Sequence, residues 1–193
     1  MEDKEELSVE ESLALINSVI NSAKKNYARG SSFHFLLWGW AIMIANLGHY
    51  VLWKFDLTDA PYVVWALTIP TAIISIVYGA RKGSRSIVKN HLDSLYGYIW
   101  LGMFIGAIIL LIFAAEATTV NGIILTFSGL GTFLTGITLR FKPSILGGIA
   151  LFVAAIVAFN TPILEQYLVG AIGIFAGYLI PGYLLKKLER TNV

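Results

Sequence analysis

The sequence predicts an all-α, polytopic membrane protein, a bundle of six transmembrane helices preceded by an amphipathic cytoplasmic helix. The first observation is six long apolar runs, because a hydrocarbon core of about 30 Å needs about 20 apolar residues of helix. The second is composition: the 193 residues are 56% hydrophobic and 13% charged, against about 25% charged in soluble domains. The third is that basic residues collect beside alternate gaps between the runs. We therefore expect a head at 1–32, a transmembrane bundle at 33–185 and a short cytoplasmic tail at 186–193.

The head has the pattern of a soluble amphipathic helix. Ser8 and Glu11 form a capping box at its start. An apolar stripe follows at spacings of three and four residues, and it contains the candidate docking residues Leu13, Ile16, Ile20 and Tyr27. The stripe could pack on the protein's own inner surface or dock in a partner's groove. A position flat in the headgroups is a third alternative, although the polar face lacks the lysines and arginines typical of such helices.

Six apolar runs follow the head, at Phe33–Trp53, Tyr62–Gly79, Leu95–Ala115, Val120–Leu139, Ser144–Phe159 and Tyr167–Leu185. Ser144–Phe159 is short and needs its flanks or a locally thin bilayer to cross. Small residues at four-residue spacing predict close helix packing in three runs, at Gly102/Gly106, Ser128/Thr132/Gly136 and Gly173/Gly177. Pro70 and Pro181 predict kinks in the second and sixth runs.

The distribution of lysine and arginine predicts the orientation. With six crossings, 13 of the 14 basic residues share one side, and only Lys54 lies on the other. Basic residues in short loops stay cytoplasmic, so both termini are expected in the cytoplasm. The longest inner loop carries a candidate basic patch of Arg81, Lys82, Arg85 and Lys89. These residues could contact lipid phosphates, a protein partner or the head, whereas nucleic-acid binding is not expected because positive-inside topology explains the patch.

Polar residues at membrane depth give the candidate site. The predicted membrane core contains no Asp, Glu, Lys or Arg, which argues against an ion-driven pump. Asn46 and His49 lie on one face of the first helix. They could bind a polar ligand or hydrogen-bond Thr68 or Thr71 of the second helix, which would fix packing by about 1 kcal/mol. We do not expect a metal site, because the other histidines, His34 and His91, are predicted near the opposite membrane face.

Motifs for catalysis are missing from the sequence. It contains no cysteine, HExxH zinc signature, GxSxG elbow, P-loop or dinucleotide fingerprint. We therefore expect a protein that is not an enzyme and needs no cofactor. The fourth run is rich in hydroxyl side chains, which could bond their own helix carbonyls or line a path: Thr126, Ser128, Thr132, Thr135 and Thr138.

The segment ESLALINSVINSAKKNYARGSSFHFLLWGWAIMIANLGHY, from Glu11 to Tyr50, resembles the head and first helix of small six-helix bacterial membrane proteins that have no assigned activity. The resemblance covers about a fifth of the chain through these residues and extends to the rest only through hydropathy. It implies a multi-pass protein of the bacterial inner membrane, and it supplies no catalytic or binding residues.

Two functions follow as expectations. The first is a non-enzymatic, partner-binding or regulatory membrane component that acts through its cytoplasmic face, because a patterned head accompanies a core without catalytic chemistry. Its expected partners are the lipid bilayer and either a cytoplasmic protein or a second copy of the chain. The alternative is a small-solute transporter or channel, suggested by Pro70, the Asn46/His49 face and the hydroxyl-rich fourth run.

Overall fold

The computed structural model describes residue 8 and residues 31–85, 91–113, 116 and 118–191. All regular structure in these residues is helical, so the all-α class is confirmed. The helices are α2 (Ser31–Lys54), α3 (Thr68–Arg85), α4 (His91–Phe113), α5 (Val120–Leu139), α6 (Lys142–Phe159), α7 (Ile163–Ile174) and α8 (Ile180–Thr191). A 3₁₀ helix, Pro61–Leu67, leads into α3, and a π-helical segment, Phe175–Leu179, joins α7 to α8. Apart from Ser8, the residues of the predicted head helix lie outside the described part of the chain.

Within the described residues, five helical segments are long and apolar enough to cross a membrane: Ser32–Lys54, Pro61–Arg81, Val120–Thr138, Lys142–Phe159 and Ile163–Arg190. A sixth apolar helix, Gly97–Phe113, is shorter. As the sequence predicted, the run Ser144–Phe159 needs its flank to span: the helix extends over Lys142–Phe159, 18 residues, the shortest of the five candidate spans in the described residues. Helix α6 begins at Lys142 with Pro143 in its first turn, where proline has no helical hydrogen bond to lose. By helix length and hydropathy, the chain is a multi-pass membrane protein.

Both prolines predicted to kink helices lie beside irregular helical segments. Pro70 is the third residue of α3, directly after the 3₁₀ helix, so it occupies a first turn where its missing N–H costs little. Pro181 is buried and follows the π-helical segment. Because proline cannot donate to the carbonyl four residues earlier, the chain changes its helical winding just before Pro181.

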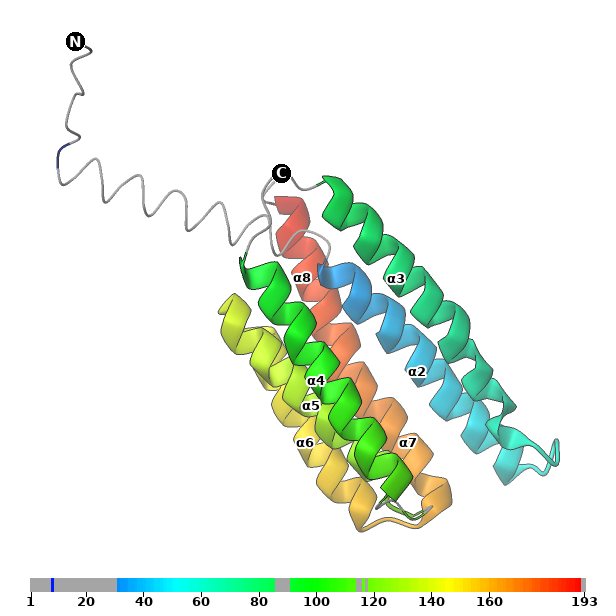
Figure 1. Cartoon of the computed structure of the whole chain (residues 1–193). Helices are drawn as coiled ribbons and strands as arrows, with labels where there is room; N and C mark the ends of the chain where they lie inside the picture. Colours follow the sequence, from blue (N-terminus) through cyan, green and yellow to red (C-terminus); the bar gives the residue numbers. More distant parts are fainter. Residues whose placement is uncertain (1–7, 9–30, 86–90, 114–115, 117, 192–193) are drawn as a thin grey trace.

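The helices divide into a packed group and two outer helices (Figure 1). The buried apolar core comes from α2, α5, α6 and the continuous α7–α8 helix, with Leu151, Ala155 and Ile174 among its members. Helix α3 packs mainly on α2, and α4 mainly on α5. Thr71 is the one buried side chain among the described residues of α3, and none of the described side chains of α4 is buried. Most of the surface of these two helices is therefore left for lipid or for another molecule.

The tightest packing joins α5 to α6, which form a hairpin. Gly122, Gly129 and Gly136 recur every seven residues along α5, where an added Cβ would lie 2.5–2.9 Å from the nearest atom of Phe159, Phe152 or Ile145. The predicted small-residue set of Ser128, Thr132 and Gly136 is divided between two neighbours: Gly136 meets α6, whereas Ser128 and the buried Thr132 lie against Tyr178 of the π-helical segment. Small residues allow such close approach in lipid, where apolar burial by itself gives helices no preference for one another.

Two other predicted small-residue pairs have different outcomes. The Gly173/Gly177 pair is confirmed as a helix contact, because an added Cβ would lie 2.7 Å from the Ala154 Cβ at Gly173 and 2.4 Å from Leu151 at Gly177. On α4, Gly106 faces the Phe127 ring, but an added Cβ at Gly102 would meet nothing within 4 Å. The Gly102/Gly106 pair is therefore not a continuous packing seam within this chain.

The first and last described helices are tied together at one end of the bundle. The Glu189 carboxylate accepts hydrogen bonds from the backbone N–H of Ser32 at 3.1 Å and from its hydroxyl at 2.7 Å. Exposed backbone N–H groups at a helix start need such acceptors, and a carboxylate there also suits the helix dipole. Figure 1 shows the start of α2, the end of α3, the start of α4 and the end of α8 at this same end.

The α5–α6 contact predicts a sharp difference between two glycine-to-alanine substitutions. At Gly148, an added Cβ would lie 2.6 Å from the Cβ and 2.7 Å from the backbone N of Phe133, so Gly148→Ala forces the helices apart. We expect it to lower the free energy of unfolding by about 1–3 kcal/mol, measured by denaturant titration in mixed micelles. The matched control is Gly102→Ala, which faces open space and should be neutral or slightly stabilising. Equal stabilities of the two variants would contradict this packing.

Candidate functional site

His49 is buried near the end of α2, and aromatic rings surround it. The indole N–H of Trp65 donates a hydrogen bond of 2.9 Å to His49 Nδ1. The Tyr167 ring stacks on the imidazole with centroids 3.9 Å apart and an interplanar angle of 15°, and the Trp53 ring lies 5.7 Å away. Because Nδ1 accepts the indole proton, this geometry requires the neutral imidazole with its proton on Nε2.

Asn46 lies one helical turn before His49 and is also buried, at 3% exposure. Its amide nitrogen donates to the Ile42 carbonyl at 2.9 Å, within the same helix. Its Oδ1 is buried with no hydrogen-bond partner among the described residues. Gly170 of α7 makes room for it, because an added Cβ there would lie 2.6 Å from Oδ1. Asn46 thus presents an acceptor at a closely packed contact between α2 and α7.

The structure does not join Thr68 and Thr71 to Asn46 or His49 through hydrogen bonds. The Thr68 hydroxyl donates to the Trp65 carbonyl at 2.6 Å, and the Thr71 hydroxyl donates to the Leu67 carbonyl at 2.7 Å. On α5, Thr126 and Thr138 bond carbonyls four residues earlier in the same way. Hydroxyl side chains commonly satisfy themselves like this in membrane helices, and these four then have no donor left for a solute.

Trp65 and Tyr167, the partners of His49, were missed by the sequence reasoning. Trp65 lies in the 3₁₀ helix at the start of the second span, and Tyr167 lies in the second turn of α7. Aromatic residues near span ends usually mark the membrane interface, which hid a specific role for either ring. Their common depth in the membrane could have suggested the contact, because His49, Trp65 and Tyr167 all lie close to the predicted outer ends of their helices.

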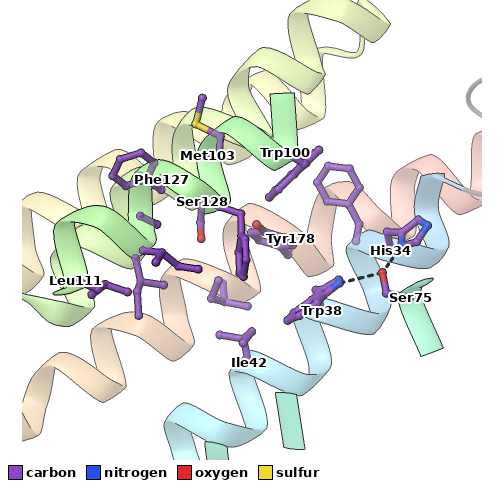
Figure 2. A pocket seen from close by; sticks show the side chains of 16 residues that line it. His34, Trp38, Ile42, Ser75, Trp100, Met103, Leu111, Phe127, Ser128 and Tyr178 are labelled. Atoms are coloured by element: carbon purple, nitrogen blue, oxygen red, sulfur yellow. Dashed lines mark hydrogen bonds between the residues drawn. The ribbon is translucent and has the colours of Figure 1, made fainter. Parts of the chain in front are cut away.

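A second feature is a cavity of about 520 Å³ between α2, α3, α4, α5 and α7 (Figure 2). Its lining is mostly apolar. Hydrogen-bonding side chains come from His34 and Trp38 on α2, Ser75 on α3, Trp100 on α4, and Ser128 and Tyr178 across the bundle. Ser75 Oγ shares a hydrogen bond of 2.9 Å with His34 Nδ1 and accepts one of 3.3 Å from the Trp38 indole. This cavity could not be predicted from the sequence, because its lining comes from five separate helices.

Most of the remaining candidate residues fall outside the part of the chain that the structure describes. The docking residues Leu13, Ile16, Ile20 and Tyr27 fall outside the described residues, as does Lys89. Lys82 and Arg85 are in α3, but their side chains are not described, while Arg81 is exposed near the end of that helix. No three histidine, aspartate or glutamate side chains of the described residues are grouped as metal ligands.

The hydrogen bond from the Trp65 indole to His49 leads to a prediction of how much stability is lost when the indole N–H is removed. Trp65→Phe keeps an aromatic ring but leaves His49 Nδ1 without its donor, so we expect a loss of about 1 kcal/mol in the free energy of unfolding. Trp40→Phe is the control, because it breaks an exposed indole-to-Tyr183 hydrogen bond of 3.0 Å. That change should cost less than about 0.5 kcal/mol in the same micelle titration. A cost for Trp65→Phe no larger than that of the control would refute a structural role for this bond.

Comparison with protein-family models, with curated proteins and with solved structures gives no significant match. The resemblance of the Glu11–Tyr50 segment therefore has no family attached to it by these comparisons. The sequence and the fold together establish a helical, multi-pass membrane protein in which five described helical segments can span a bilayer by length and composition.

Proposed function

We propose that this chain is a non-enzymatic membrane component with six spans and both termini in the cytoplasm, and that it binds or regulates a partner through its cytoplasmic end. The observation that carries the proposal is the gathering of charged and chain-terminal elements at one end of the bundle. The head joins the bundle at Ser31, beside Glu189 of the last helix. A surface made from the head, the inner loop after α3 and the end of α8 would present several contacts to one partner.

The described charges support this orientation. Exposed basic residues lie at the end of the bundle where α3 and α8 end and α6 begins: Arg81, Arg140, Lys142, Lys186, Lys187 and Arg190. The opposite end has Lys54 together with Asp56, Asp59, Glu116 and Glu165. Under the positive-inside rule, the first end faces the cytoplasm. All these basic residues lie on one side of the membrane only if α4 also crosses it. This supports six spans, although the apolar stretch of α4 is shorter than those of the other helices.

The interior favours binding over transport. The Asn46 and His49 side chains, which suggested a solute path, are closed in by Gly170, Tyr167 and Trp65. Where α5, α6 and α7 meet, the glycines are packed so closely that an added Cβ would lie nearer to the neighbouring helix than Cβ atoms ordinarily do. Close-packed interiors of this kind leave no room for water, so the packed group of helices is better suited to act as a rigid scaffold.

Orientation can be measured by cysteine labelling, because the chain has no cysteine of its own. A membrane-impermeant maleimide should label Asp59→Cys and Asn160→Cys in intact cells. Ser84→Cys and Thr191→Cys should react only after permeabilisation, and none of these four changes removes a basic residue. Protection of Ser84→Cys with labelling of Thr191→Cys would mean that α4 does not cross the membrane. Labelling of both would overturn the proposed orientation.

Partner binding through the head can be tested by crosslinking in native membranes. Leu13→Asp, Ile16→Asp and Ile20→Asp together should abolish a specific crosslink, because a charged stripe cannot enter an apolar groove. The matched control carries the same added charge on the polar face, as Asn17→Asp, Ser18→Asp and Asn21→Asp, and should keep the crosslink. Both variants must reach the membrane in equal amounts. Loss of the crosslink in both variants, or no crosslink with the unchanged chain, would count against the proposal; a crosslink between two copies would identify the partner as the chain itself.

A further inference from the structure

The cavity between the outer helices and the packed group has the size of a ligand site. Its volume is about 520 Å³, and small-molecule sites commonly enclose about 300–1,000 Å³. It exists because α3 packs mainly on α2 while α4 packs mainly on α5. The two outer helices therefore leave a space over the packed group instead of closing against each other.

Some residues of the cavity lining are exposed at the side of the bundle. Phe104 and Ile108 of α4 line the cavity and are 64% and 38% exposed. On the α3 side, Ser75 lines the cavity, and its sequence neighbours Ile74 and Ile76 are exposed. In a bilayer, such exposed apolar side chains meet lipid tails. An apolar molecule can therefore enter between α3 and α4 from the hydrocarbon core.

The polar groups of the lining are concentrated toward one end of the cavity, although Ser128 and Tyr178 add hydroxyl groups nearer its middle. His34, Trp38 and Ser75 form one hydrogen-bonded group, and Figure 2 shows Leu111 at the far side of the cavity from it. Ala107 and Ile124 add to the apolar stretch. A ligand that fits has a long apolar tail and a hydrogen-bonding group at one end, as an acyl chain with its glycerol ester does.

The polar end lies toward the end of the bundle that carries the exposed basic residues, where the Glu189 carboxylate is held by its hydrogen bonds from Ser32. Arg81 follows Ser75 by six residues on the same helix, which is about 9 Å of helical rise, and its side chain is exposed. A phosphate attached just beyond the ester region of a lipid would lie at this level. Anionic headgroups gain about 1 kcal/mol from each lysine or arginine close to the membrane surface.

We propose that the cavity binds one acyl chain of an anionic phospholipid, with the ester region at His34, Trp38 and Ser75 and the headgroup near Arg81. Assignment to the cytoplasmic leaflet rests on the proposed orientation, whereas the cavity and its contacts do not. The π-helical segment contributes to the site through Tyr178, which is buried and lines the cavity. Such segments are frequent at functional sites because they change which side chains a helix presents.

Native mass spectrometry of the full chain in mild detergent tests this proposal independently of orientation. The delipidated protein should bind one phosphatidylglycerol, and more tightly than phosphatidylcholine of the same acyl length. Ala107→Phe fills the cavity and should weaken phosphatidylglycerol binding at least about tenfold. Leu110→Phe is the matched control, because it adds the same ring on α4 outside the lining, and it should bind as the unchanged chain does. Arg81→Gln should reduce the preference for phosphatidylglycerol by about threefold.

Several results would overturn the proposal. Equal binding by Ala107→Phe and Leu110→Phe would remove the cavity as the site, and equal binding of the two lipids would remove the anionic headgroup. Should Ala107→Phe fail to fold, the unchanged chain can be titrated with phosphatidylglycerol brominated on its acyl chain. Quenching of tryptophan fluorescence that saturates at one equivalent supports the site beside Trp38 and Trp100, and quenching that rises without saturation refutes it. Cysteine labelling reports orientation alone, so failure there would leave the lipid result standing.

Discussion

Lipid offers a helix neither hydrogen bonds nor a reason to prefer a neighbouring helix over an acyl chain, and this constraint governs the whole structure. Where helices do associate, they must approach closely enough for dispersion contacts to exceed those with lipid. The glycines at 122, 129 and 136 supply that approach between α5 and α6. The same constraint explains why threonines such as Thr71 and Thr126 bond carbonyls of their own helix.

Close helix packing is not the same throughout the described helices, and it separates a packed group from two outer helices. The packed group of α2, α5, α6 and α7–α8 is held by small residues and by the Ser32–Glu189 hydrogen bonds between the first and last helices. Helices α3 and α4 pack mainly on one neighbour each, and most of the surface of their described residues stays exposed.

Sequence reasoning succeeded where a property could be summed along a segment. The run Val120–Leu139 coincides with α5, and the shared face of Asn46 and His49 follows from their spacing. Sequence reasoning failed where it had to choose which face of a helix contacts a given neighbour. Both Ser128/Thr132/Gly136 and Gly122/Gly129/Gly136 place small residues on one side of α5, and only the positions of α6 and of Tyr178 decide that the glycines meet α6 while Ser128 and Thr132 meet Tyr178. Likewise, Trp65 and Tyr167 were not predicted to contact His49, because nothing in their spacing points to it.

The sequence alone determined the surrounding solvent, the helical class and the separation of basic from acidic ends, because hydropathy and charge are local properties that add along the chain. The tertiary structure decided which small residues touch, which ring bonds His49 and where a cavity remains. The physical reason is that these membrane helices are apolar on nearly every side, so their sequences carry little information about rotation around the helix axis. That rotation is fixed only when neighbouring helices pack against one another.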